Sequence, residues 1–170
     1  MILGMSTATY TFLHVLISLI GIGSGLIVMY GFLSRKRLDS MTAVFLVTTV
    51  LTSVTGFGFP VAHLLPSHIV GIISLVALAI AIPARYGFHL EGRWRSTFVV
   101  SASIALYLNV FVLVVQLFEK VPALKALAPT QSEPPFKIVQ LLVLALFIAL
   151  TVISVKKFRP AELQTFKRAA

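Results

Sequence analysis

Histidine is the residue type in this sequence that is best suited to bind a metal ion or a haem. The chain has four histidines and no cysteine, which excludes thiolate zinc sites, iron–sulfur clusters and cysteine nucleophiles. Three of the histidines, His14, His63 and His68, stand near the ends of apolar stretches. Two imidazoles from different helices can be the axial ligands of a b-type haem. Three imidazoles together with the carboxylate of Glu119 can bind zinc, copper or iron.

The elements that must position these histidines are membrane-spanning helices. Hydrophobic residues make up 58% of the chain and charged residues 11%, against about 25% charged residues in soluble domains. The mean hydropathy is +1.01, so a free-standing soluble globule is excluded. In lipid every backbone polar group must pair internally, and a helix needs roughly 20 apolar residues to span the bilayer. We therefore predict an all-α polytopic membrane protein with one domain, residues 1–170, and five transmembrane helices at about 9–33, 41–65, 68–84, 97–118 and 138–155.

The basic residues predict how these helices are oriented. Eleven of the 14 Lys and Arg residues lie in the connections 34–40 and 85–96 or after residue 155. The positive-inside rule places those segments in the cytoplasm, so the N-terminus is outside and the C-terminus is inside. The basic excess is then a topology signal and a contact with anionic lipid headgroups of the bilayer. Nucleic-acid binding is not needed to explain it.

With this orientation a layer of polar side chains is expected near the outer surface. It consists of His14, His63, His68, Gln116, Glu119 and Gln140. Gln116, Gln140 and the mid-membrane Asn109 could orient the ligands of a metal or haem, or contact a quinone headgroup. The same three amides could instead form hydrogen bonds between helices, and the histidines could be packing or interfacial residues.

Small residues follow the histidines along both of the first two helices. Ser18, Gly21 and Gly25 share one helix face with His14, and Thr49, Thr52 and Gly56 lie on a similar stripe of the second helix. A porphyrin held between two helices needs small residues of this kind. Close packing of one helix on another needs them equally, so the stripes leave both interpretations open.

The connection 119–137 is the only one long enough to carry structure of its own. It contains four prolines and a segment, 123–128, that could form one or two helical turns. We predict an ordered cap in which Val121, Leu124, Leu127 and Phe136 turn toward the membrane or the helix ends.

Three stretches resemble a family of small integral membrane proteins of proteobacteria. They are LHVLISLIGIGSGL at 13–26, TSVTGFGFP at 52–60 and VPALKALAPTQSEPPF at 121–136. The resemblance covers nearly the whole chain and implies a bacterial inner membrane. It implies no activity, and no residue role follows from it.

These features allow three functions. The first is an inner-membrane subunit whose histidine site near the periplasmic face binds a b-type haem or a transition metal, for electron transfer or a quinone-linked redox step. The second is a non-catalytic accessory or assembly protein that docks on other membrane subunits or on a second copy. The third is a small transporter or channel, which five helices without a visible inverted repeat make the weakest. Whether the chain is an enzyme is left open.

The predicted topology can be tested with single cysteines, because the chain has none of its own. An impermeant thiol reagent added to intact cells should label cysteines placed at Ser67 and Ser132 and should spare those at Ser40 and Ala170. Labelling at Ala170, or protection at Ser132, would contradict the five-span topology.

Overall fold

The fold is all-α, with five helices that are long and apolar enough to cross a membrane. The computed structural model describes residues 4–59 and 66–158. Its elements are α1 (Thr7–Leu33), α2 (Asp39–Gly56), α3 (Pro66–Ile82), the π-helical turn η1 (Pro83–Gly87), α4 (Arg93–Lys120), the short α5 (Pro122–Leu127) and α6 (Pro134–Lys157). The composition and the five spans together mark a multi-pass membrane protein, as the sequence predicts.

Two helix ends show how local sequence sets the boundaries. The sequence predicts that the second helix runs to residue 65, but α2 ends at Gly56. The prediction is therefore wrong for residues 57–59, and residues 60–65 lie outside the described part of the chain. Gly56 and Gly58 explain the early end, because glycine is among the weakest helix formers. At Pro83 the missing N–H breaks the regular hydrogen-bond ladder, and α3 passes into the wider turn η1.

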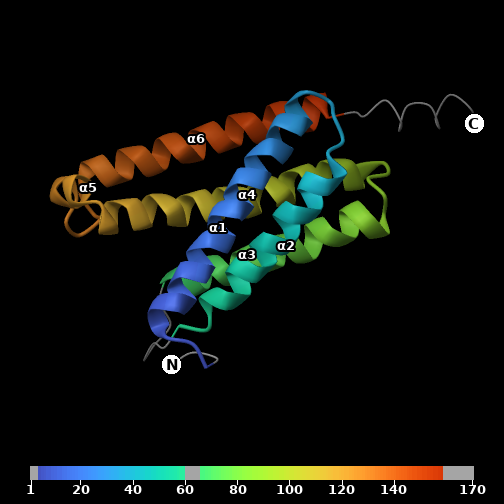
Figure 1. Cartoon of the computed structure of the whole chain (residues 1–170). Coiled ribbons are helices and arrows are strands. Elements are labelled where there is room, and N and C mark those ends of the chain that lie inside the picture. Colours follow the sequence, from blue (N-terminus) through green and yellow to red (C-terminus); the bar gives the residue numbers. More distant parts are fainter. Residues whose placement is uncertain (1–3, 60–65, 159–170) are drawn as a thin grey trace, which may run out of the picture.

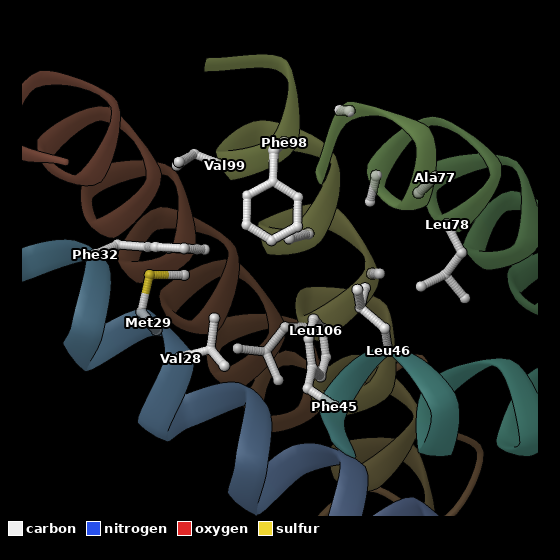
Figure 2. Close-up of a cluster of buried hydrophobic side chains, with 14 of the residues drawn as sticks. Val28, Met29, Phe32, Phe45, Leu46, Ala77, Leu78, Phe98, Val99 and Leu106 are labelled. Atoms are coloured by element: carbon white, nitrogen blue, oxygen red, sulfur yellow. The ribbon is translucent and has the colours of Figure 1, made fainter. Parts of the chain in front are cut away.

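The two ends of the bundle differ in how tightly the helices pack. We call the end where α1 begins the α5 end, and the opposite end the η1 end (Figure 1). The large buried cluster draws on α1, α2, α3, α4 and α6, and Figure 2 shows Val28, Phe45 and Leu106 pointing to its centre. Along α1 the buried residues from Gly21 to Phe32 lie in the half toward the η1 end, whereas residues 11–20 include none.

Toward the α5 end the helices separate into two arms. One arm consists of α1, α2 and α3, and the other consists of α4, α5 and α6 (Figure 1). The second arm has a small core of its own, in which Val114, Phe118 and Ala128 are buried and Leu124 and Phe136 pack against them. The α5 end therefore has an ordered cap over α4 and α6, and the predicted short helix is confirmed as α5.

The four apolar side chains predicted to turn toward the membrane or the helix ends form two pairs. Val121 and Leu127 are 37% and 58% exposed, while Leu124 and Phe136 face the small core as expected. The exposure of Val121 and Leu127 is compatible with the predicted turn toward the membrane.

The close approach of α1 to its neighbours should make Gly25 sensitive to any added atom. A Cβ built there would lie 2.5 Å from a methyl carbon of Leu106 and 2.8 Å from the ring of Phe45, both in the buried cluster. We expect Gly25→Ala to lower the free energy of unfolding by about 1–3 kcal/mol through overpacking. Gly23→Ala is the matched control on the same helix, because nothing lies within 4 Å of its added Cβ. Thermal unfolding in one detergent measures both, and equal midpoints would contradict this packing.

The cap should depend on Glu133, which precedes α6. One carboxylate oxygen accepts hydrogen bonds from the backbone N–H and the hydroxyl of Thr130, and the other accepts one from the N–H of Ser132. Glu133→Ala should speed cleavage of the segment 121–136 by chymotrypsin several-fold, because the turn loses its acceptors. Glu119→Ala is the control, since within the described residues Glu119 pairs with the adjacent Lys120 and not with the turn before α6. Equal cleavage rates would show that Glu133 does not order the cap.

The same carboxyl predicts a pH dependence of the cap. Desolvation opposes the shift, but the hydrogen bonds from Thr130 and Ser132 hold the pKa of Glu133 below its usual value. A depressed pKa means that the ordering is fully present above the unfolded-state pKa and is lost as the pH falls through the folded-state pKa. Amide exchange of Thr130 and Ser132, corrected for the intrinsic rate, should therefore accelerate only at acidic pH, and Glu133→Gln should remove that step.

Candidate functional site

The antiparallel packing of α1 on α2 positions the histidine that the sequence singles out. Beginning at the η1 end, Gly25 lies against Phe45, and Gly21 lies against Thr48 and Thr49. Nearer the α5 end, the ring of His14 lies against Thr55 and Gly56. The two small-residue stripes therefore face each other, and helix packing uses the space that a porphyrin would need between them at that level.

His14 is held at Nδ1 by a hydrogen bond to the hydroxyl of Thr55, with 2.8 Å between Nδ1 and Oγ1. That hydroxyl donates its own proton to the backbone carbonyl of Leu51, 2.7 Å away. A hydroxyl has one proton to give, so in this bond Nδ1–H must be the donor and Oγ1 the acceptor. In the neutral ring the lone pair therefore sits on Nε2, the tautomer that metal-bound histidines use and that can accept a proton or a hydrogen bond.

Tyr10 and Phe59 complete the surroundings of this histidine. The Tyr10 hydroxyl donates to the backbone carbonyl of Thr55 at 2.8 Å. The edge of one ring meets the face of the other both between Tyr10 and Phe59 and between His14 and Phe59, with centroids 5.1 and 5.3 Å apart. These contacts fix the imidazole plane. His14 itself is half-buried, and its chain neighbours Leu13 and Val15 are 39% and 46% exposed on the apolar surface.

Of the other two predicted histidines, the structure describes His68. His68 is buried at the start of α3, where its ring stacks on Phe57 with centroids 5.4 Å apart. The ring contact of His14 is with Phe59 and that of His68 is with Phe57. His63 lies outside the described residues. In the described part of the chain, no three His, Cys, Asp or Glu side chains gather in a way that could hold a metal ion.

The carboxylate and amides predicted for the site fall in different places. Glu119 is exposed on α4 and pairs with Lys120 at 3.0 Å, and Gln116 is exposed on the same helix. Gln140 is buried, and its Nε2 donates to the carbonyl of Phe111 at 3.2 Å, which links α6 to α4. Asn109 is buried and donates to the Thr49 hydroxyl at 3.3 Å. Both buried amides therefore form the hydrogen bonds between helices that the sequence left as one interpretation.

Sequence reasoning missed two residues that define the environment of His14. Tyr10 stands one turn before His14, so the i, i+4 spacing on one helix face could have found it. Thr55 stands beside the predicted stripe of Thr52 and Gly56, but its role depends on which carbonyl takes its proton, and spacing does not reveal that.

Compared with protein-family models, with curated proteins and with solved structures, this chain matches none of them. The family resemblance seen in the sequence therefore stays a prediction, and the function has to be argued from the site itself.

Proposed function

We propose that this chain is a multi-pass subunit of the bacterial inner membrane that binds a quinol headgroup at His14. The observation that carries the proposal is the hydrogen bond between His14 and Thr55, which leaves Nε2 as an acceptor on a half-buried ring. A quinol diffuses in the bilayer, and its hydroxyl group can donate a hydrogen bond to one such acceptor. Binding to a quinol would make the chain a quinone-linked component of a larger redox complex.

The charges at the η1 end indicate how the chain is oriented in the membrane. The connection after α1, the segment from η1 to the start of α4, and the end of α6 together hold most of the basic residues. By the positive-inside rule this end is cytoplasmic, and the α5 end faces the periplasm. His14 is about 10 Å along the helix axis from the first residue of α1, which puts it in the outer leaflet.

A quinol fits the described geometry better than a haem or a metal ion does. A metal ion needs several protein ligands at once, and a b-type haem held by two imidazoles needs them on opposite faces of one porphyrin. Among the described residues no three metal-binding side chains gather, and close contact of α1 with α2 fills the space between the stripes. One hydrogen-bond acceptor on a half-buried ring at the α1–α2 contact is enough for a quinol.

The test measures the affinity of the protein in lipid nanodiscs for a short-chain ubiquinol by titration calorimetry. His14→Phe keeps a ring against Phe59 but removes the acceptor, so we expect binding to weaken about tenfold, as loss of a hydrogen bond of roughly 1.4 kcal/mol predicts. Thr55→Val should weaken binding as well, since Nδ1 loses its acceptor and the tautomer is no longer fixed. Thr11→Val is the control, because that exposed hydroxyl bonds only to its own helix.

Unchanged affinity in His14→Phe would contradict the quinol site. An absorption spectrum of the purified protein then identifies the alternative. A reducible Soret band that His14→Gln and His63→Gln abolish and His89→Gln keeps would establish a haem site instead. A colourless protein with stoichiometric copper or zinc would establish a metal site. A protein with neither cofactor nor quinol affinity would be an accessory or assembly subunit.

A further inference from the structure

A second feature, independent of His14, lies on the lipid-facing side of α2 toward the η1 end. It is an apolar groove of about 360 Å³ between α2 and the end of α3. The lining residues are Ala43, Leu46, Val47, Val50, Leu51, Ile82 and Tyr86. The small side chain of Ala43 and the turn η1, which carries Tyr86 outward at 50% exposure, leave this space open.

The dimensions of the groove match a single hydrocarbon chain. Ala43 and Leu51 are eight residues apart on α2, so the groove runs about 12 Å along the helix. One leaflet of a bilayer core of about 30 Å offers roughly 15 Å to an acyl chain. The aliphatic side chains of the lining have no polar groups, so an acyl chain can pack against them without leaving a hydrogen-bonding group unpaired.

A cluster of cations surrounds the first residue of α2, one turn before the first lining residue of the groove. Asp39 is one turn before Ala43 on the same face of α2. Its carboxylate pairs with two guanidinium groups, that of the buried Arg85 and that of Arg37, whose Nε lies 2.8 Å away. Two cations on one carboxylate leave a net positive charge at the start of α2, one turn before Ala43, and the exposed Arg35 and Lys36 precede Arg37.

Arg37 is the member of the cluster best placed to contact a headgroup. Its side chain is 32% exposed, whereas that of Arg85 is 2% exposed and committed to the interior. Arg37 meets Asp39 through Nε, which leaves the two terminal amino groups of a guanidinium for a second acceptor such as a phosphate.

We propose that this groove and cluster bind one anionic phospholipid, with an acyl chain along α2 and the phosphate on Arg37. The apolar lining accounts for the chain, and the net positive charge at the start of α2 accounts for the headgroup. The groove is lined by one face of α2 and by two further residues, Ile82 and Tyr86. It is therefore too narrow for a helix of a partner protein. Leu51 is common to the two sites, its side chain in the groove lining and its backbone carbonyl as the acceptor for Thr55, but the variants that test the groove leave Leu51 unchanged, so the two proposals are tested separately.

Native mass spectrometry of the purified chain tests the proposal with two added lipids of identical acyl chains. Phosphatidylglycerol should be retained about fivefold better than phosphatidylcholine, as expected for one additional cation–anion contact. Ala43→Phe should abolish retention of phosphatidylglycerol by filling the groove, and Val47→Phe should do so if Ala43→Phe does not fold. Ala145→Phe is the matched control, an exposed alanine of α6 outside the groove.

The charge is tested separately from the groove. Arg37→Gln should erase the preference for phosphatidylglycerol while leaving both lipids weakly bound, and Arg93→Gln, an exposed cation at the start of α4, should leave the preference intact. Equal retention of the two lipids by the unaltered protein would overturn the proposal. So would a groove variant that changes the fraction of dimer instead of lipid retention, since the groove would then hold a second copy of the chain.

Discussion

The architecture depends on how closely α1 approaches α2 and α4 at two glycines. A Cβ at Gly21 would lie 3.1–3.7 Å from Thr48, Thr49 and Asn109, and one at Gly25 would meet Phe45 and Leu106 more closely still. In a bilayer the lipid tails are as apolar as the helix faces, so association relies on close packing and on hydrogen bonds between helices. The bond from Asn109 to Thr49 supplies such a link at the same level. This three-helix junction fixes the register that brings His14 to Thr55.

The sequence predicts the spans well because hydrophobic length is the physical property that the bilayer selects. It overextends α2 because FGFPVAHLL, at 57–65, is as apolar as a span, whereas the end of the helix is decided by Gly56 and Gly58. The short helix in the cap is predictable because Pro122 and the alanines beside it form a local signal. The hydrogen-bond partner of each buried amide is not predictable from the sequence, because it depends on how α4 is rotated against α2 and α6.

The candidate site shows the same division. His14 stands out from the sequence because an ionisable group in hydrocarbon is costly. The glycine and serine stripe beside it fits a porphyrin and a helix equally well, and only the placement of α2 distinguishes them. Which ring nitrogen of His14 carries the proton is even harder to predict from the sequence. It follows from a chain of two bonds, His14 to Thr55 and Thr55 to the Leu51 carbonyl, of which the second is within one helix.

The two ends of the bundle are packed unequally, so they differ in how much their helices contribute to holding the fold together. At the η1 end the buried cluster is continuous across five elements, and Arg95 ties the start of α4 to the carbonyls of Val155 and Phe158. At the α5 end, residues 11–20 of α1 bury no side chain completely, so their outward face contributes little to holding the fold together. A quinol that binds beside His14, as proposed, would therefore displace lipid from this face. The junction at Gly21 and Gly25 lies between the site and the η1 end, so the proposed exchange would not require that close packing to open.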